Sequence, residues 1–391
     1  MHDIPRGWTT GKLESLVWIK SGSAAHFDPL GSIPVMGANG QIGRTSQSNF
    51  GPGYLVGRVG AAGAVNRVDG PCWASDNVLT VLARDHVMDE SFLGHLLRYA
   101  NPAQLATRQA QPLITQTNLG ALRVRYPICV GEQRRIAEIL DALDEQINCE
   151  RRLADKLQSV SLGIIESIFE GMVDGPVRGL VSNEDRRQEE CALGDLGTWL
   201  SGGTPSTSDP GFWGGEIPWI SAASMKDFYI SHSDRRVTQS GASAGTRLVP
   251  SGTVLFVVRG MSLKKEFRVG VTVREVAFGQ DCKAIIPRDD IDGTFLALAL
   301  RAKSQLVLRM VDEAGHGTGR LPTDAIAKMR ITVPPFTAQR RIVDTVQAFD
   351  RRLNAQMVTL EKLLLLRQGL AEDLLTGRVR VPEAEAVVES L

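Results

Sequence analysis

One long segment occurs twice in the chain, and this repeat constrains the fold more than any other feature. The first copy, EQRRIAEILDALDEQINCERRLADKLQSVSLGIIESIFEG, spans residues 132–171, and the second, AQRRIVDTVQAFDRRLNAQMVTLEKLLLLRQGLAEDLLTG, spans residues 338–377. The copies align over 40 residues without a gap. Self-similarity of this kind indicates a duplicated structural unit.

Both copies are predicted to be long helices. Neither contains proline, and each ends in a glycine, Gly171 or Gly377, that suits a left-handed C-cap. Gly131 and Thr337 are the expected N-caps. Forty residues of helix reach roughly 60 Å at 1.5 Å per residue. Such a helix is too long for a small domain and must connect separate parts of the protein.

Apolar side chains recur in both helices at alternating spacings of four and three residues. This heptad pattern predicts that the helices pair as a coiled coil. The predicted seam contains Ile136, Leu140, Leu143, Ile147, Glu150, Leu157, Ile342, Val346, Phe349, Leu353, Leu360 and Arg367. Its polar positions suggest a register in which Glu150 faces Arg367 and Ser161 faces Gln356. The alternative is that these polar residues are chance interruptions of the seam.

The blocks that precede the helices also resemble each other. Leu13, Leu16, Ser21 and Gly22 match Leu193, Leu196, Ser201 and Gly202. Alternating apolar runs bounded by turn residues predict strands, and denser apolar periodicity predicts helices. Strands are expected at 54–59, 78–83, 253–258, 270–273 and 283–287, and helices at 91–99 and 294–309.

The predicted fold is therefore α+β, with two similar mixed α/β domains, two long helices and an internal pseudo-two-fold repeat. The expected boundaries are a first domain at 1–130, a helix at 131–171, a linker at 172–190, a second domain at 191–336, a helix at 337–378 and a frayed tail at 379–391.

Charge and cysteine content narrow the function classes. Residues 1–130 carry 11 Lys/Arg against 8 Asp/Glu, and residues 191–337 carry 17 against 14, whereas residues 132–171 carry 5 against 9. Two mildly basic blocks therefore flank an acidic stretch, which is weak support for nucleic-acid binding. Five scattered cysteines and an N-terminus without an apolar signal region predict a reduced cytoplasmic compartment. The longest apolar runs are too short to cross a membrane.

No catalytic constellation or metal site is expected. Gly60-Ala61-Ala62-Gly63 is a lone glycine loop, and the six histidines are scattered. The sequence has neither the Asn/Asp-Pro-Pro-aromatic motif of methyltransferases nor a Walker lysine motif.

The order of motifs resembles the specificity subunit of type I restriction–modification systems. The resemblance covers nearly the whole chain. It rests on GEQRRIAEIL (131–140) and PPFTAQRRI (334–342), and on IPVMGANGQIGRT (33–45), RQAQPLITQTNLGALRVRYP (108–127) and LGDLGTWLSGGTPSTSDPGFWGGEIPWIS (193–221). Ala338 stands where the family usually has Glu, and Tyr126-Pro127-Ile128 lacks a doubled proline, which weakens carry-over at those positions.

The resemblance implies a mechanism. Each domain would read one half of a bipartite target in double-stranded DNA. The two helices, paired antiparallel about an approximate internal two-fold axis, would form an antiparallel coiled coil that sets the gap between the halves. The implied partners are methyltransferase subunits, which use S-adenosylmethionine to methylate adenine N6, and ATP-driven restriction subunits. No cofactor is expected in this chain. Two alternatives stay open: an enzyme that acts alone, and a coiled-coil scaffold that joins two protein-binding domains.

Residues that can donate to phosphates and base edges cluster in the Gly-rich loops. The DNA-binding candidates are Asn39, Gln41, Arg44, Arg58, Gln111, Lys226, Arg259, Lys264, Lys265, His316, Thr318 and Arg320. Matched residues at the two helix starts are candidates either for partner binding or for packing of the helix on its domain. They are Gln133, Arg134, Arg135, Gln339, Arg340 and Arg341. Trp73 and Trp219 are expected to be core residues.

Overall fold

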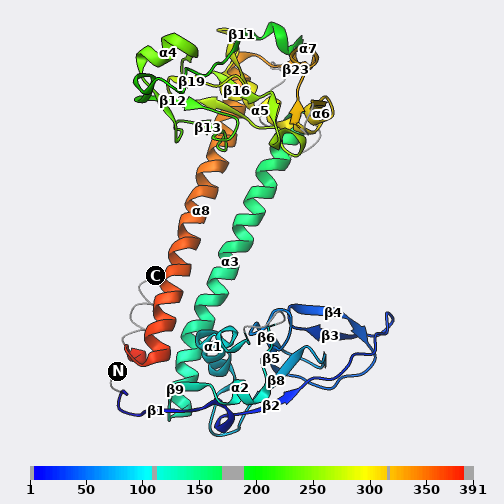
Figure 1. Cartoon of the computed structure of the whole chain (residues 1–391). Helices are drawn as coiled ribbons and strands as arrows, with labels where there is room; N and C mark the ends of the chain where they lie inside the picture. Colours follow the sequence, from blue (N-terminus) through cyan, green and yellow to red (C-terminus); the bar gives the residue numbers. More distant parts are fainter. Residues whose placement is uncertain (1–3, 108–111, 170–188, 315–317, 383–391) are drawn as a thin grey trace. The chain divides into compact units, whose positions relative to one another are not determined.

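The computed structural model describes residues 4–107, 112–169, 189–314 and 318–382 (Figure 1). The chain divides into two units, of which the first comprises residues 1–153 and 356–391 and the second residues 154–355. Each long helix therefore contributes to both units. We describe the two units separately.

The first unit begins with short strands and ends with a helix. Its elements are β1 (Trp8–Lys12), η1 (Leu13–Ser15), β2 (Val17–Ser21), β3 (Ile33–Gly37), β4 (Gly40–Thr45), β5 (Gly53–Gly57), β6 (Val65–Val68), β7 (Trp73–Ala74), β8 (Val78–Ala83), α1 (Glu90–Ala100), η2 (Pro102–Leu105), α2 (Gln116–Gly120), β9 (Arg123–Pro127) and the first part of α3 (Val130–Phe169). β5 and β8 match the predicted strands, and α1 matches the predicted helix.

Three sheets organise these strands. A four-stranded sheet has the order β2-β8-β5-β6, a three-stranded sheet has the order β4-β3-β7, and β1 pairs with β9. β3 and β7 run parallel, whereas the other neighbours are antiparallel. β5 lies inside its sheet and all its residues are buried, which explains its continuous apolar run.

Helix α1 covers the core of the first unit. The side chain of Asp89 caps it by accepting a hydrogen bond from Phe92 N at 3.1 Å. Phe92 and Leu93 are fully buried in a cluster that also holds Leu79 and Tyr54. Burial of a Phe or Leu side chain contributes about 1.5–3 kcal/mol relative to exposure, so this helix face anchors the unit.

The second unit repeats this plan with additional strands. Its elements are β10 (Glu189–Ala192), η5 (Leu193–Asp195), β11 (Gly197–Ser201), η6 (Pro210–Phe212), β12 (Trp213–Ile220), β13 (Tyr229–Ile230), β14 (Arg236–Val237), α4 (Gln239–Gly245), β15 (Leu248–Val249), β16 (Val254–Val257), β17 (Arg259–Gly260), η7 (Ser262–Lys264), β18 (Val269–Thr272), β19 (Val276–Phe278), β20 (Cys282–Pro287), α5 (Gly293–Ala302), α6 (Ser304–Leu308), β21 (Asp312–Ala314), β22 (Thr318–Arg320), α7 (Thr323–Ala327), β23 (Arg330–Val333) and part of α8 (Phe336–Thr376).

The two units share one topology. The sheet β11-β20-β16-β18-β13 repeats the order β2-β8-β5-β6 and adds one edge strand. The pair β10-β23 repeats β1-β9, and the parallel pair β12-β19 repeats β3-β7. This correspondence confirms the duplicated α/β plan that the sequence predicts.

One predicted helix is wrong as a single element. Residues 294–309 form two helices, α5 and α6, because Lys303 has φ −89° and ψ 16° and leaves the helical path. The apolar pattern continues through the break, since Val307 in α6 is buried in the same core as Phe295 in α5.

The two long helices confirm the central prediction, although their starts differ. α3 begins at Val130 and α8 at Phe336, so Gly131 and Thr337 lie inside helices and are not N-caps. Gly377 ends α8 with φ +73°, the left-handed conformation that glycine adopts without strain. Gly171 lies outside the described residues, as does most of the predicted linker at 172–190.

Within the first unit α3 and α8 pack antiparallel. Ile136 and Leu140 share a core cluster with Leu370 and Leu374 near the start of α3. Further along α3, Ile147 packs with Leu360 and Leu363. The predicted seam residues Ile136, Leu140, Leu143, Ile147, Leu157, Ile342, Val346 and Leu360 are buried, and Glu150, Phe349, Leu353 and Arg367 are half-buried.

The predicted register is wrong. Glu150 accepts a hydrogen bond from Gln356 Nε2, and Arg367 Nε donates to Asp144 Oδ1 at 2.9 Å. A heptad seam repeats itself, so several registers bury the same apolar residues. Here Arg367 meets the carboxylate of Asp144, which lies beside the seam and was absent from the predicted pairing.

The start of the predicted frayed tail is packed on the first unit. Arg378 forms an ion pair with Asp373, Arg380 Nη1 donates to Glu132 Oε1 at 3.0 Å, and Val381 is buried. The prediction of a frayed tail is therefore wrong for residues 379–382, because Arg380 pairs with Glu132 and Val381 is buried.

Trp219 is buried, as predicted, whereas Trp73 is half-buried and donates from Nε1 to Ser23 O at 3.1 Å. Among the described residues, no helix combines the length and apolarity needed to cross a membrane.

Candidate functional site

Three of the predicted DNA contacts lie together on the β3–β4 ribbon of the first unit. Asn39 occupies the turn between the strands, and Gln41 and Arg44 lie on β4, with all three side chains exposed. Arg44 Nη1 donates to Ser32 O at 3.2 Å, and Gln41 Nε2 donates to Gly43 O at 3.1 Å. The ribbon therefore presents amide and guanidinium groups, the types that hydrogen-bond to adenine and guanine edges.

Arg58 lies apart from this ribbon, directly after β5. Its side chain is half-buried, its main-chain N donates to Asn77 O at 2.8 Å, and its O accepts from Ile114 N at 3.0 Å. Arg58 thus borders the segment 112–114. Gln111, the fifth candidate of this unit, lies outside the described residues.

In the second unit the candidates gather on the small sheet β17-β22-β21. The antiparallel register sets Arg259 opposite Arg320, and both side chains are exposed. Thr318 begins β22 and is half-buried. Lys264 pairs with Glu313 of β21, and this hydrogen bond holds the pKa of the Glu313 carboxyl below its ordinary value. A short ribbon of mixed charge results, because Asp312 of β21 lies opposite Arg320 and the neighbouring Glu313 pairs with Lys264.

The remaining candidates of the second unit do not all join this ribbon. Lys265 is exposed and follows η7 directly, next to Lys264. Lys226 is exposed in the loop before β13, at the edge of the five-stranded sheet. His316 lies outside the described residues.

The matched glutamines at the two helix starts are buried, and each hydrogen-bonds its helix to the domain; we call this arrangement the glutamine lock. Gln133 Oε1 accepts from Asp89 N at 2.8 Å, while Nε2 donates to Pro127 O at 2.8 Å and Val87 O at 3.1 Å. Gln133 has no exposed surface. Its three hydrogen bonds tie α3 to the start of α1 and the end of β9.

Gln339 makes the same contacts in the second unit. Its Oε1 accepts from Asp292 N at 2.8 Å, and its Nε2 donates to Pro334 O at 2.9 Å and Asp290 O at 3.0 Å. Gln339 is 1% exposed. Of the two roles that the sequence left open for these glutamines, the geometry supports packing on the domain.

The neighbouring arginines remain on the surface. Arg134 and Arg340 are exposed and lie 3.5 and 3.3 Å from the carboxylates of Asp89 and Asp292, which cap α1 and α5. Arg135 and Arg341 are also exposed. These four arginines are the part of the predicted partner surface that solvent reaches.

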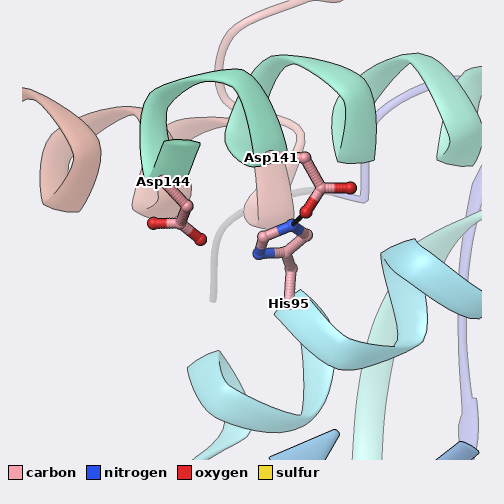
Figure 2. A group of neighbouring side chains, drawn as sticks. All are labelled: His95, Asp141 and Asp144. Carbon is pink, nitrogen blue, oxygen red and sulfur yellow. Dashed lines mark hydrogen bonds and ion pairs between the residues drawn. The ribbon is translucent and has the colours of Figure 1, made fainter. Parts of the chain in front are cut away.

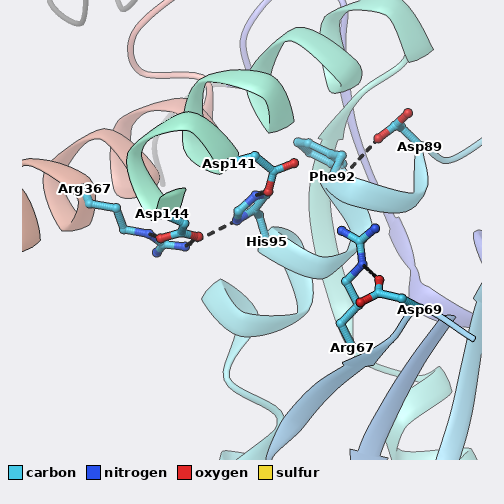
Figure 3. A network of polar contacts seen from close by, with 8 residues as sticks. All are labelled: Arg67, Asp69, Asp89, Phe92, His95, Asp141, Asp144 and Arg367. Carbon is cyan, nitrogen blue, oxygen red and sulfur yellow. Dashed lines mark hydrogen bonds and ion pairs between the residues drawn. The ribbon is translucent and has the colours of Figure 1, made fainter. Parts of the chain in front are cut away.

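A polar cluster in the first unit was not predicted from the sequence. His95 of α1 is 2% exposed, and its Nε2 lies 2.9 Å from Asp141 Oδ1 of α3 (Figure 2). Arg367 of α8 donates from Nη2 both to Asp144 Oδ2 at 3.1 Å and to His95 Nδ1 at 3.3 Å (Figure 3). The spacing of Asp141 and Asp144 on one helix face was the available signal.

The hydrogen bonds of this cluster determine the form of His95. Because Arg367 can only donate, Nδ1 must accept and Nε2 must carry the proton that goes to Asp141. Burial lowers the pKa of His95, against the opposing effect of Asp141. The imidazole of His95 and the carboxylates of Asp141 and Asp144 place metal-ligating atoms within 4.8 Å of one another. In this structure the positive charge beside them is the guanidinium of Arg367, which pairs with Asp144.

The duplicated α/β unit, with a long helix after each copy, defines a class of proteins built from two similar domains and a pair of long helices. The chain belongs to the family of the type I restriction modification DNA specificity domain, whose model matches residues 5–159 and 187–362.

Individual proteins of this kind are similar to the chain. The EcoR124I/EcoR124II specificity subunit of Escherichia coli is 29% identical over 191 residues, which cover 48% of this chain and 47% of that protein. The MjaIX specificity subunit of Methanocaldococcus jannaschii is 26% identical over 178 residues, which cover 44% of this chain and 40% of that protein. The alignments thus span about half of these relatives or less.

Solved structures show the same fold. The S subunit of a type I restriction-modification system from M. genitalium matches with a TM-score of 0.64 and 19% identity, over 94% of this chain and 96% of that one. A chain from a structure concerned with complex assembly and conformational transition of the type I R-M system matches with a TM-score of 0.59 and 17% identity, over 97% and 100%.

Proposed function

We propose that this protein is the DNA-recognition subunit of a cytoplasmic type I restriction–modification complex, in which each unit reads one half of a bipartite target. The observation that carries the proposal is the duplicated frame with differing ribbons. Both units have the same sheet order and the same glutamine lock, whereas the polar ribbon is β3–β4 in one and β17-β22-β21 in the other. A fixed frame with variable polar loops suits recognition of two different sequences.

The exposed candidate side chains are of two chemical kinds, which suit different parts of DNA. Asn39 and Gln41 each offer an amide donor and acceptor to base edges, and Arg44, like Arg259 and Arg320 in the second unit, offers paired donors. Lys265 and Lys226 are exposed ammonium groups that suit phosphates. We assign the former to sequence reading and the latter to backbone contact, with Arg58, Gln111, Lys264, His316 and Thr318 as further contacts.

The partners follow from the family. The methyltransferase subunits would carry S-adenosylmethionine and the restriction subunits ATP, so the chemistry takes place on those chains. We propose Arg134, Arg135, Arg340 and Arg341 as partner contacts, because they are exposed at matched places beside the helix starts. Gln133 and Gln339 would hold those helix starts in position from within.

Selection from random DNA tests the proposal. The chain, purified with its methyltransferase subunits, is incubated with a pool of random duplexes, and bound molecules are sequenced. We expect one motif in two parts with a constant gap, and binding that weakens steeply with salt. Arg44→Ala should relax one half only and Arg320→Ala the other. Binding without any sequence preference, or no binding, would favour the scaffold alternative.

A further inference from the structure

A polar cleft of about 500 Å³ lies in the first unit between the four-stranded sheet, α1, α3 and the last part of α8. Four arginines line it, Arg67, Arg98, Arg151 and Arg367, together with Asp141 and Asp144. It is distinct from the β3–β4 ribbon, whose candidate contacts are absent from its lining. The cleft therefore needs an explanation of its own.

Two of the four arginines already form ion pairs with acidic side chains. Arg67 Nε donates to Asp69 Oδ1 at 2.7 Å, and Arg367 holds Asp144, as Figure 3 shows. Arg98 and Arg151 are exposed, and their guanidinium groups have no hydrogen bond or ion pair within the part of the chain that the structure describes. Of the two carboxylates, Asp144 is neutralised by Arg367, and Asp141 accepts from His95.

A tyrosine also belongs to the lining of this cleft. Tyr54 is 1% exposed and belongs to the cleft lining. Its ring lies against the backbone of α1 at Gly94, where an added Cβ would come within 2.2 Å of the hydroxyl oxygen. No hydrogen bond to the Tyr54 hydroxyl is found among the described residues, and unlike the Tyr229 hydroxyl this oxygen is not fully buried. Burial raises the pKa of Tyr54, so the hydroxyl keeps its proton and can donate.

We propose that this cleft binds a phosphate group through the guanidinium groups of Arg98 and Arg151 and the hydroxyl of Tyr54. Arginine presents several donors in a planar fork that matches phosphate oxygens, and the tyrosine adds a directed donor from the wall. Arg67 lies on the same lining but is paired with Asp69. Asp141 and Asp144 line the cleft too, but His95 and Arg367 engage them.

The phosphate group can come from two sources. One is the DNA backbone, which would deepen the proposed function and rests on it. The other is a small phosphate compound in solution, which does not depend on that function. Both present tetrahedral anionic oxygens, so the cleft chemistry is the same and binding experiments must separate them.

The DNA arm compares Arg151→Ala with Arg152→Ala in the full-length chain with its methyltransferase subunits. Arg152 is the neighbour on α3, is exposed and does not line the cleft, so it is a matched control. Loss of one phosphate contact makes the slope of log affinity against log salt about 0.9 less steep. Between 50 and 200 mM salt, the affinity of Arg151→Ala should then fall by about 3.5-fold less than that of the control, for target and non-target duplexes alike.

The small-molecule arm measures pyrophosphate binding to the full-length chain by calorimetry. Tyr54→Phe keeps the buried ring and removes only the hydroxyl, so folding is preserved while a donor is lost. A small-compound source predicts binding that Arg98→Ala and Tyr54→Phe weaken at least about tenfold, in the range of one lost charge-assisted hydrogen bond, with Arg152→Ala unchanged.

The outcomes separate the two proposals. A changed salt slope identifies the DNA backbone as the source, and changed pyrophosphate binding identifies a small compound. If both measurements are the same for Arg151→Ala and Arg152→Ala, and Tyr54→Phe changes neither, the phosphate site is overturned. If the unmodified chain shows no preference for any duplex sequence, the proposed function fails, and the pyrophosphate arm still decides the cleft.

Discussion

Replacement of Gln133 by leucine should loosen the first unit at the junction of α1, β9 and α3. The substitution keeps the apolar volume but removes the amide that satisfies three backbone groups, Asp89 N, Pro127 O and Val87 O. Val87 is exposed, so water can replace one of these bonds. Two backbone groups then lose their partner in a buried place, at about 1–3 kcal/mol each, for a total of about 2–6 kcal/mol.

Hydrogen exchange followed by mass spectrometry can measure this loss in each unit separately. A loss of 2–6 kcal/mol corresponds to protection that falls by about 30-fold or more, since about 1.4 kcal/mol is a factor of ten. The fall should appear in peptides of α1 and β9 for Gln133→Leu, and in peptides of α5 and β23 for Gln339→Leu. Gln146→Leu is the control, because the side chain of Gln146 is exposed on α3 and makes no hydrogen bond among the described residues.

Equal protection in Gln133→Leu and Gln146→Leu would refute the lock. A fall in both units from either single substitution would contradict the separate roles of the two glutamines.

Three further predictions concern titratable and reactive groups. Burial lowers the pKa of His95 in the folded state, so the unfolded state takes up a proton first as pH falls below its ordinary pKa of 6.5. The stabilisation from neutral His95 is thus complete above about pH 6.5 and is lost below it, and His95→Gln should flatten the fall of the unfolding midpoint between about pH 7.5 and 5.5. An equally steep fall in the variant would contradict this. Arg367→Met should destabilise the first unit by about 1–3 kcal/mol, because Asp144 and His95 lose their donor, and urea unfolding of this variant with and without Asp144→Asn should reveal non-additive effects. Additive effects would show that the pair is not coupled. Finally, burial raises the pKa of Cys282 to about 12, so a thiol reagent should label the exposed Cys129 and Cys149 in the folded chain and reach Cys282 only after unfolding, whereas rapid labelling of Cys282 would contradict its burial.

The duplicated architecture could be predicted because the repeat and the heptad pattern are local in sequence. Forty residues without proline and with a regular apolar spacing leave little choice but a long helix. The strands at 78–83 and 253–258 were also found, since buried central strands have continuous apolar runs. The break at Lys303 was missed because the apolar pattern passes through it.

Register and polar partners could not be predicted in the same way. The seam is compatible with several registers, and the choice depends on Asp144 and His95, which reach Arg367 only in three dimensions. The burial of Gln133 depends on Asp89, 44 residues earlier, whose role as the cap of α1 was not assigned from the sequence. The ribbon that pairs Arg259 with Arg320 joins segments about sixty residues apart, so residue type suggested the candidates but not their grouping.

The most direct test of the account is a map of N6-methyladenine in the genome of a cell that carries this protein and its methyltransferase. The account predicts a two-part motif with a constant gap that is lost when the gene is deleted. Exchange of residues 1–130 for the matching domain of another family member should change one half of the motif and leave the other half and the gap intact. A motif that persists without the gene, or an exchange that alters both halves, would contradict the account.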